Sequence, residues 1–399
     1  MVCEVLLTGP RGDNPLGFLA ALGVLATLGD VGIPGSLAWE GMAPRLNVDL
    51  QATAGHTSAH DQEVRGALVG VLHAALRRER GAGAAQAEEA RKEMERAKTA
   101  CKHKRMEIKA RRLPRQEAAD ARRRELGPLE LELRERTRAF QELLVESAAD
   151  PSVALGKNLT ESNARLRAHL EAACGSCEPL DRRWADLAAA YGVADPAGPA
   201  ERMLASPWAL VSGSGHQHFL SSVQDLMVQC ARGHLEQALF GPWEPQDERY
   251  SLRLDASDDR RYALMARDPT ADDNKPRTLW GANRLAFEAL RFFPAMPAAG
   301  GMAVGGWRAP ERNWEEGCVV RWPLWRHPLS RDVVRSVLGL DDLSLSGSSA
   351  SRSLEGLGIH TVMESRRIAV GEGPNRKHNL TPPAPVWVST GSGHMAQPI

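Results

Sequence analysis

The stretch Ser-Gly-Ser-Gly-His-Gln-His at residues 212–218 holds the side chains best suited to chemistry. It precedes a helix expected over residues 219–232, so its glycine-rich backbone would present N–H groups at a positive helix end, where anions bind. Two histidines two residues apart would share a face of a strand, which suits a metal ion. A helix N-terminus capped by Ser214, with exposed histidines, is the simpler interpretation. The candidate anion-binding residues are Ser214, Gly215, His216 and His218.

Recognised catalytic signatures are missing from the sequence. It has no Walker A, GxSxG or HExxH pattern, and Gly213-Ser-Gly215 lacks the third glycine of GxGxxG. Cys174-Gly-Ser-Cys177 is a lone CxxC without the second ligand pair of a structural zinc site. The sequence therefore favours a protein without catalytic residues, cofactor or metal. A metal-dependent hydrolase that uses His216 and His218 with an acidic neighbour such as Asp225 remains an alternative.

Positive charge gathers in one segment, although Lys plus Arg and Asp plus Glu both number 50 in the whole chain. Residues 91–124 contain 14 basic and 5 acidic side chains. Such an excess can neutralise several phosphates and gives sequence-independent, salt-sensitive affinity for nucleic acid. A solvated helix surface with i,i+4 ion pairs is the alternative. The cations with the fewest acidic neighbours are candidate nucleic-acid contacts: Arg111, Arg112, Arg115, Arg122, Arg123 and Arg124.

A second group of cations follows a polar loop near residue 274. Lys275 and Arg277 lie in this loop, and Arg284 ends the stretch Trp280-Gly-Ala-Asn-Arg284. All three remain as cations to which we assign no ion-pair partner. We therefore expect all three to be available to a phosphate backbone.

The basic segment belongs to a long helical insertion over residues 84–147, which is rich in Ala, Glu, Arg and Lys. Pro114 does not fit a helix interior, so we expect two antiparallel, coiled-coil-like helices, 84–112 and 115–147, joined near Pro114. Gly127-Pro128 should kink or break the second helix. Residues 125–146 contain six acidic and three basic side chains, so we expect nucleic-acid contact mainly near the turn.

The N-terminal region predicts a buried helix between strands. Residues 3–7 resemble a strand, and residues 16–28 form a helix that is apolar on every face and must therefore be buried. Asn14 suits its N-cap and Pro15 its first turn. Residues 36–50 alternate as a strand pair would, and residues 60–78 have helical periodicity.

The fold class expected is α+β, a mixed globular fold with a long inserted helical hairpin. Seven of the ten tryptophans follow residue 240. We expect a strand at 250–255 and a loop at 344–353. The predicted parts are an N-terminal α/β part (1–83), the charged hairpin (84–147), a helical segment (148–206), a Trp-rich α+β region (207–390) and a disordered tail (391–399).

Membrane association is not expected. No segment approaches the roughly 20 apolar residues that cross a bilayer. The apolar run 16–28 lacks a basic region before it, which argues against a signal peptide. Six cysteines in a chain of 399 residues do not form a disulfide framework, so reduced thiols and a cytoplasmic location are expected.

Four stretches together resemble proteins of type I-G (formerly I-U) CRISPR loci. They are Leu-Thr-Gly followed by Asn14-Pro-Leu-Gly-Phe-Leu-Ala-Ala-Leu, then Gly-His-Gln-His-Phe-Leu-Ser-Ser, Asp-Arg-Arg-Tyr-Ala-Leu and Trp-Gly-Ala-Asn-Arg-Leu-Ala. The resemblance covers about half of the chain, its first 50 residues and residues 210–330. It implies a large-subunit-like protein or a helicase-nuclease-extension protein, and it transfers no catalytic residue.

The partners implied by this resemblance are a guide RNA or target DNA and other subunits of an effector complex. The function expected is a non-catalytic subunit of an antiviral ribonucleoprotein that contacts nucleic acid. A protein–protein adaptor, in which the helical hairpin binds a partner and nucleic acid plays no part, is the alternative from another class.

Overall fold

The computed structural model describes residues 2–50, 58–81, 83–155, 159, 163–175, 179–195, 203–211, 218–256, 277–298, 301–309, 317–344, 348–370 and 377–389. These residues form two compact units. The main unit combines Met1–Arg77 with Asn158–Ile399, and the helical unit is Arg78–Lys157. Helices and strands both contribute, so the α+β class is confirmed. Within the described ranges, no helix has the length and hydropathy that crossing a membrane requires. The predicted tail at 391–399 lies outside them.

Helix α1 (Pro15–Asp30) forms the centre of the main unit. The Asn14 side chain caps it by accepting hydrogen bonds from the backbone N–H groups of Leu16 at 2.9 Å and Gly17 at 3.4 Å. Every residue from Pro15 to Leu28 is buried. The predicted cap, first-turn proline and all-round burial are thus confirmed.

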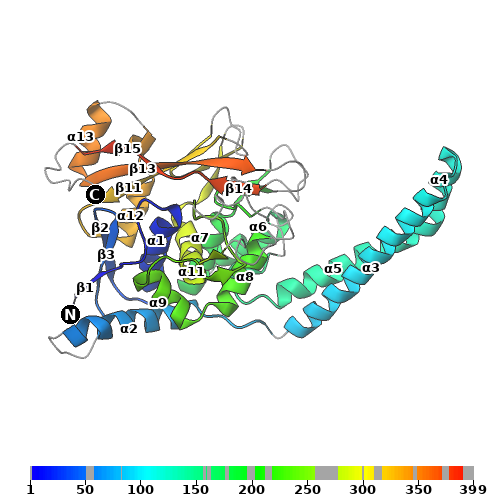
Figure 1. The fold of residues 1–399 in the computed structure, drawn as a ribbon, viewed down its shortest axis with the longest axis horizontal. Coiled ribbons are helices and arrows are strands. Elements are labelled where there is room, and N and C mark those ends of the chain that lie inside the picture. Colours follow the sequence, from blue (N-terminus) through cyan, green and yellow to red (C-terminus); the bar gives the residue numbers. More distant parts are fainter. Residues whose placement is uncertain are drawn as a thin grey trace. The chain divides into compact units, whose positions relative to one another are not determined.

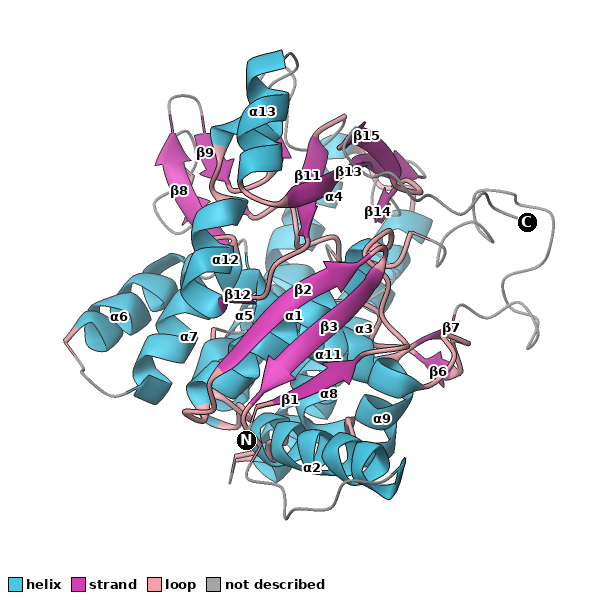
Figure 2. Ribbon diagram, turned by 90° about the vertical axis from the view of Figure 1, so that its left-hand side faces the viewer, coloured by secondary structure: helices cyan, strands magenta, loops and turns pink. Residues whose placement is uncertain are grey.

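An antiparallel sheet covers α1 (Figure 2). Its strand order is β1-β3-β2-β12, and β2 and β3 are the predicted strand pair. In β12, Leu329 pairs with Leu37, so a strand from late in the chain completes a sheet that begins at Cys3. The strands are β1 (Cys3–Leu6), β2 (Gly35–Glu40), β3 (Ala43–Val48) and β12 (Leu329–Ser330).

The closest helix contact in the main unit joins α1 to α11 (Trp280–Ala289). A Cβ at Gly23 would lie 1.9 Å from the backbone oxygen of Leu285, so only glycine permits this approach. The other helices before the second sheet are α2 (Ser58–Leu76), α6 (Asn163–Cys174), α7 (Pro179–Ala189), α8 (Phe219–Gln229) and α9 (Arg232–Phe240). Short strand pairs lie among them: β4 (Gly192–Ala194) with β5 (Met203–Ala205), β6 (Asp247–Glu248) with β7 (Arg277–Thr278), and β8 (Ala295–Ala298) with β9 (Gly301–Val304).

A second sheet has the order β10-β11-β13-β14, and β15 also pairs with β13. An aromatic core links it to the first sheet: the Phe18 ring lies 5.7 Å from that of Trp39 and 5.8 Å from that of Trp322. The Trp325 indole donates to the Leu37 carbonyl at 2.6 Å. The elements are β10 (Trp307–Arg308), β11 (Val319–Trp325), α12 (Arg331–Leu338), α13 (Ser348–Gly356), β13 (Ile359–Val370), β14 (Lys377–Leu380) and β15 (Ala384–Val388).

Two local predictions are wrong. Residues 250–255 do not form a strand; Arg249, Tyr250 and Arg253 have positive φ, and the Asn283 side chain accepts the Leu252 N–H at 2.9 Å instead of a neighbouring strand. Residues 348–353 belong to helix α13 and not to a loop. Leu354 is buried in this helix, which packs against β13, so tertiary contact overrides a composition of serine and glycine.

The helical unit contains α3 (Ala84–Ala110), α4 (Arg115–Ala121), a π-helical turn (Arg122–Leu126) and α5 (Gly127–Glu146). Helices α3 and α5 run side by side (Figure 1). The turn between α3 and α4 precedes Pro114, as predicted. The α-helix is interrupted at Gly127-Pro128, as predicted, but by a π-helical turn and not by a loop: the Gly127 N–H bonds the Arg122 oxygen, and Pro128 lies in the first turn of α5, where its missing N–H is not needed.

Candidate nucleic-acid interface

An apolar seam holds α3 against α5. Cys101, Ile108 and Leu126 form its buried centre, with Ala121, Leu129 and Leu133 packed against it. Cys101 and Ile108 are seven residues apart, so they lie on one face of α3. Because this narrow face takes up the apolar side chains, the remaining surface of the helical unit is free to carry charge.

Ion pairs neutralise much of that charge along the two helices. Within α3, Arg91 lies 2.7 Å from Glu88 and Lys98 lies 3.5 Å from Glu95. Between the helices, Arg105 lies 2.8 Å from Glu130. This part of the surface matches the alternative of a solvated face with paired charges.

Arg111 is also ion-paired. The prediction that it has too few acidic partners is therefore wrong. Its guanidinium bonds the Glu125 carboxylate at 2.6 Å and also bonds Glu107. Lys104 lies 2.7 Å from Glu107. Hydrogen bonds donated by Lys104 and then Arg111 lower the pKa of Glu107 to about 2, and the hydrogen bonds that Arg111 donates to Glu125 and Glu107 raise the pKa of Arg111. This network connects α3 to the π-helical turn and occupies Arg111.

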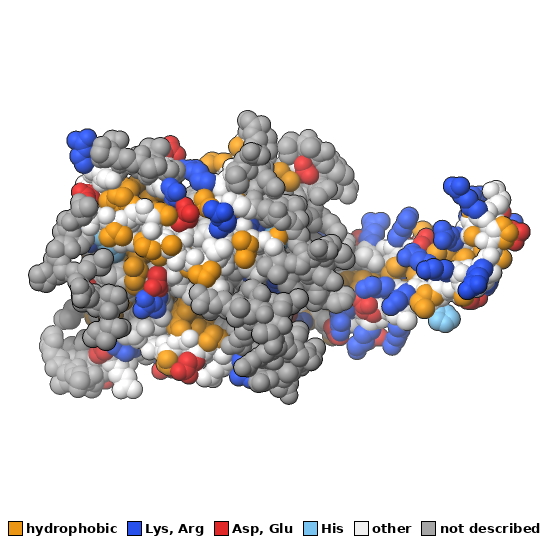
Figure 3. Space-filling model, turned by 45° about the horizontal axis from the view of Figure 1, so that its top comes forward, with side chains coloured by type: hydrophobic (Ala, Val, Ile, Leu, Met, Phe, Trp, Pro, Cys, Tyr) orange, Lys and Arg blue, Asp and Glu red, His pale blue; other side chains and the backbone are white. Residues whose placement is uncertain are grey.

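The other predicted cations of the helical unit are exposed. We define the tip cations as the exposed basic residues around the turn from α3 to α4 that form no ion pair within the described part of the chain: Lys109, Arg112, Arg115, Arg122, Arg123 and Arg124. Two carboxylates, Glu117 and Asp120, lie among them and are likewise not ion-paired there. The tip therefore has a net positive charge that internal pairing does not remove, and Figure 3 shows Lys and Arg side chains crowded on this unit.

Lys109 was not among the predicted contacts, and neither was Lys102, which is exposed and not ion-paired within the described residues. A sequence signal existed for both. Neither has an Asp or Glu three or four residues away on either side, so no helical ion pair could form. Checking each lysine for such partners would have found them.

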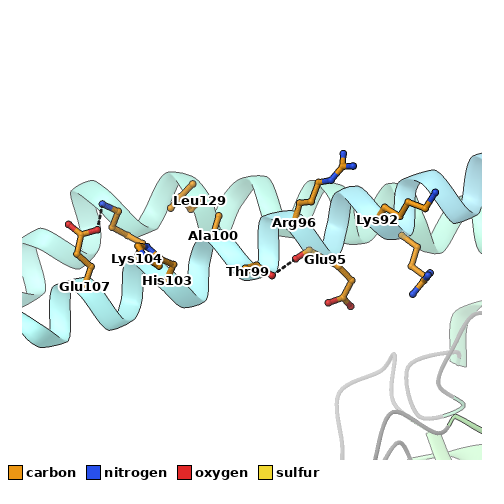
Figure 4. A pocket seen from close by; sticks show the side chains of 10 residues that line it. Lys92, Glu95, Arg96, Thr99, Ala100, His103, Lys104, Glu107 and Leu129 are labelled. Atoms are coloured by element: carbon orange, nitrogen blue, oxygen red, sulfur yellow. Dashed lines mark hydrogen bonds and ion pairs between the residues drawn. The ribbon is translucent and has the colours of Figure 1, made fainter.

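An open groove of about 1000 Å³ runs along α3 (Figure 4). Lys92, Arg96, His103 and Lys104 line it from α3, and Leu129 lines it from α5. Its carboxylates belong to Glu95 and Glu107, which are paired with lysines. Arg91, Lys92 and Lys104 are ion-paired as well, so the charge left in the groove within the described residues is that of Arg96, and it has the same sign as the tip.

The sites predicted in the main unit do not come together. Ser214, Gly215, His216, Lys275 and Cys177 lie outside the described residues. His218 is the N-cap residue of α8, and its side chain does not make the capping hydrogen bond. Arg277 is exposed on β7. The prediction for Arg284 is wrong, because this residue is fully buried in α11 and cannot reach a phosphate backbone from there.

Arg284 belongs to a buried ionic cluster. Its guanidinium lies 2.7 Å from the carboxylate of Glu288, which is fully buried and also bonds Arg183. Arg291 approaches Glu288 at 3.5 Å and Asp30 at 2.7 Å. Burial alone would raise the pKa of Glu288, but the charges of Arg183, Arg284 and Arg291 outweigh it and lower the pKa below its usual range. The cluster connects α1, α7 and α11, which is a structural role.

Within the described ranges, no three His, Cys, Asp or Glu side chains gather as metal ligands would. Neither a protein-family model nor a curated protein sequence matches this chain significantly.

Proposed function

We propose that this chain is a non-catalytic subunit of a CRISPR-type antiviral ribonucleoprotein complex and contacts nucleic acid through the tip cations. One observation supports this contact most: within the described residues, six exposed cations without ion pairs lie around one turn beside two unpaired carboxylates, whereas cations elsewhere on α3 and α5 are largely paired. In this proposal α3 and α5 act as a coiled-coil-like hairpin that presents the tip.

The chemistry of the tip suits phosphates and not bases. Five of the six tip cations are arginines, whose planar guanidinium groups bind phosphate oxygens in pairs. Residues 109–124, which hold the tip cations, contain no Phe, Tyr, Trp or His. Since base stacking needs an exposed ring, contact through the tip would be sequence-independent and strongly salt-dependent.

The assignment to an antiviral complex depends on the resemblance of four stretches to type I-G proteins. Two of them, around Asn14 and Trp280, form α1 and α11, whose contact is the tightest in the main unit. The resemblance therefore lies in the residues that build the scaffold. The partners proposed are a guide RNA or target DNA and the other subunits of the effector complex.

The test is a salt titration of nucleic-acid binding by the full chain. Replacing Arg122, Arg123 and Arg124 together by Gln should weaken binding to labelled DNA or RNA. It should also reduce the slope of log affinity against log salt by about 2 to 3, since each phosphate contact contributes about 0.9. Fluorescence anisotropy from low to physiological salt measures both quantities.

A matched variant controls for overall charge. Replacing Arg91, Lys92 and Lys98 by Gln also removes three positive charges, but from exposed side chains that are already ion-paired. This variant should keep nearly the whole salt slope of the unaltered chain. Equal effects of the two variants, or binding that ignores salt, would reject the tip as the contact.

A protein–protein adaptor is the second candidate, and exposed apolar side chains of the helical unit favour it. Met106 on α3 is 62% exposed and Leu131 on α5 is 58% exposed. Replacing both by Ser should release co-expressed effector subunits if the adaptor function holds. In that case the Arg122, Arg123 and Arg124 variant would leave nucleic-acid affinity unchanged.

A further inference from the structure

Three ring side chains from separate segments of the main unit meet at a partly exposed place. They are His234 on α9, Tyr250 after β6 and Trp280 at the start of α11. The Trp280 ring centroid lies 5.0 Å from that of His234 and 5.4 Å from that of Tyr250. In Figure 2, α9, β6 and β7 lie together at one edge of the main unit. Unlike the fully buried Trp322 and Trp325, all three rings retain contact with solvent.

The surrounding backbone fixes Trp280 in position. The Asp247 carboxylate accepts the Trp280 backbone N–H at 2.7 Å, and the indole N–H donates to the Arg249 carbonyl at 3.3 Å. A Cβ at Gly281 would lie 2.1 Å from the His234 oxygen, so glycine is needed for α11 to approach α9. Trp280 is therefore held in place, which lowers the entropic cost of stacking another ring on it.

Positive charge flanks the rings. Strand β6 pairs with β7, with Glu248 opposite Arg277, and this brings Arg277 beside the segment that carries Arg249 and Tyr250. Both arginines are exposed, and neither forms an ion pair within the described residues. The Asp247 carboxylate is occupied by the Trp280 N–H and lies 3.7 Å from His234 Nε2.

We propose that His234, Tyr250 and Trp280 form a stacking site for a base of unpaired nucleic acid, with Arg249 and Arg277 contacting the adjoining phosphates. Exposed rings next to unpaired guanidinium groups are the combination by which single strands are bound. The flanking charge favours a nucleotide over a neutral sugar, which would also stack on a tryptophan. The choice of ligand rests on the proposed function, but the site differs from the tip, which offers no ring.

The experiment compares two labelled single-stranded probes of roughly ten nucleotides. One is oligothymidylate, and the other has the same number of phosphates but abasic sugars. The full chain should bind oligothymidylate about tenfold more tightly, since stacking one base contributes about 1–3 kcal/mol. Trp280→Ala should remove this preference, and Trp280→Phe should keep most of it.

Two further variants separate this site from the tip and from a folding defect. Trp387→Ala removes a partly exposed tryptophan of β15, whose indole also donates a hydrogen bond, and should leave the preference intact. The variant with Gln at Arg122, Arg123 and Arg124 should lower the affinity for both probes by the same factor, so the ratio of the two affinities should stay the same. If Trp280→Ala unfolds the chain, the double change Arg249→Gln and Arg277→Gln tests the same site. It should lower the affinity for both probes.

Each outcome decides between the two proposals. Equal, salt-dependent binding of both probes by the unaltered chain would overturn the stacking site and leave the tip contact standing. A preference that survives Trp280→Ala would place stacking elsewhere. Binding of a neutral sugar without any affinity for either probe would overturn the nucleotide as ligand, and no binding of either probe at any salt concentration would overturn both proposals.

Discussion

Arginine and glutamate side chains form both the ionic cluster around Glu288 and the surface network of the helical unit, yet the two regions use them differently. In the cluster, Glu288 is fully buried and Arg284 and Arg291 are at most 3% exposed. In the network, the side chains of Arg138 and Glu142 are 83% and 53% exposed. Burial removes the water that would otherwise compete with each pair, so loss of one partner is costly only in the cluster.

Sequence spacing does not distinguish the two cases. Arg284 and Glu288 are four residues apart, as are Arg138 and Glu142. The first pair is buried within the main unit, where Glu288 also bonds Arg183 of α7, and the second lies in solvent on α5. Only cations that the fold leaves exposed and unpaired, such as the tip cations, are therefore available to a partner.

The largest effect should come from breaking the buried cluster. Glu288→Ala leaves the charges of Arg183, Arg284 and Arg291 without their shared carboxylate, so we expect a loss of about 3–5 kcal/mol in the free energy of unfolding. Urea unfolding followed by tryptophan fluorescence measures it cleanly, because all ten tryptophans lie outside residues 78–157. Asp61→Ala, which removes the exposed partner of Arg65 on α2 in the same unit, is the control and should leave the transition in place; equal shifts for the two variants would break the comparison.

An intermediate effect should appear in the Arg111 network. Arg111→Gln removes one of the two cations that lower the pKa of Glu107, so this pKa should rise from about 2 toward 4.5. Because the pKa is lowered in the folded state, Glu107 stabilises the helical unit above pH 4.5 and loses this contribution as the pH falls toward 2. Carbon-13 NMR titration of the glutamate carboxyls measures the midpoint. Lys102→Gln on the same helix should leave it unchanged, and an unmoved midpoint in Arg111→Gln would contradict the network.

The smallest effect should come from an isolated surface pair. Arg138→Gln removes the ion pair with Glu142, and we expect a change within about 0.5 kcal/mol. Hydrogen–deuterium exchange of α5 peptides measures it, with Arg134→Gln as the matched control, since Arg134 is exposed on the same helix without an ion pair in the described part of the chain. A loss in Arg138→Gln well above that in Arg134→Gln would show that exposed pairs contribute more here than the comparison assumes.

Local chemistry was predictable wherever neighbouring residues decide the structure. Asn14 and Pro15 specify the start of α1, and Pro114 is the residue directly before α4. Predictions failed where distant residues intervene. The Asn283 side chain accepts the Leu252 N–H in place of a neighbouring strand. Packing against β13 stabilises α13 although this helix is rich in serine.

The candidate site was likewise predictable only in part. Arg112, Arg115, Arg122, Arg123 and Arg124 are exposed as expected, although Asp120 and Glu125 lie three or four residues from some of them. Arg111 was not predictable, because Glu125 reaches it across the turn, fourteen residues away.

By itself, the sequence determined the α+β class, the buried nature of α1 and the concentration of positive charge within residues 91–124. These follow from composition, periodicity and caps, which act over a few residues. Only the tertiary structure decided which cations remain free, that Arg284 is a core residue, and that His234, Tyr250 and Trp280 meet. Those outcomes depend on contacts between residues far apart in the chain, where burial and pairing, and not spacing, set the energy of a charge or a ring.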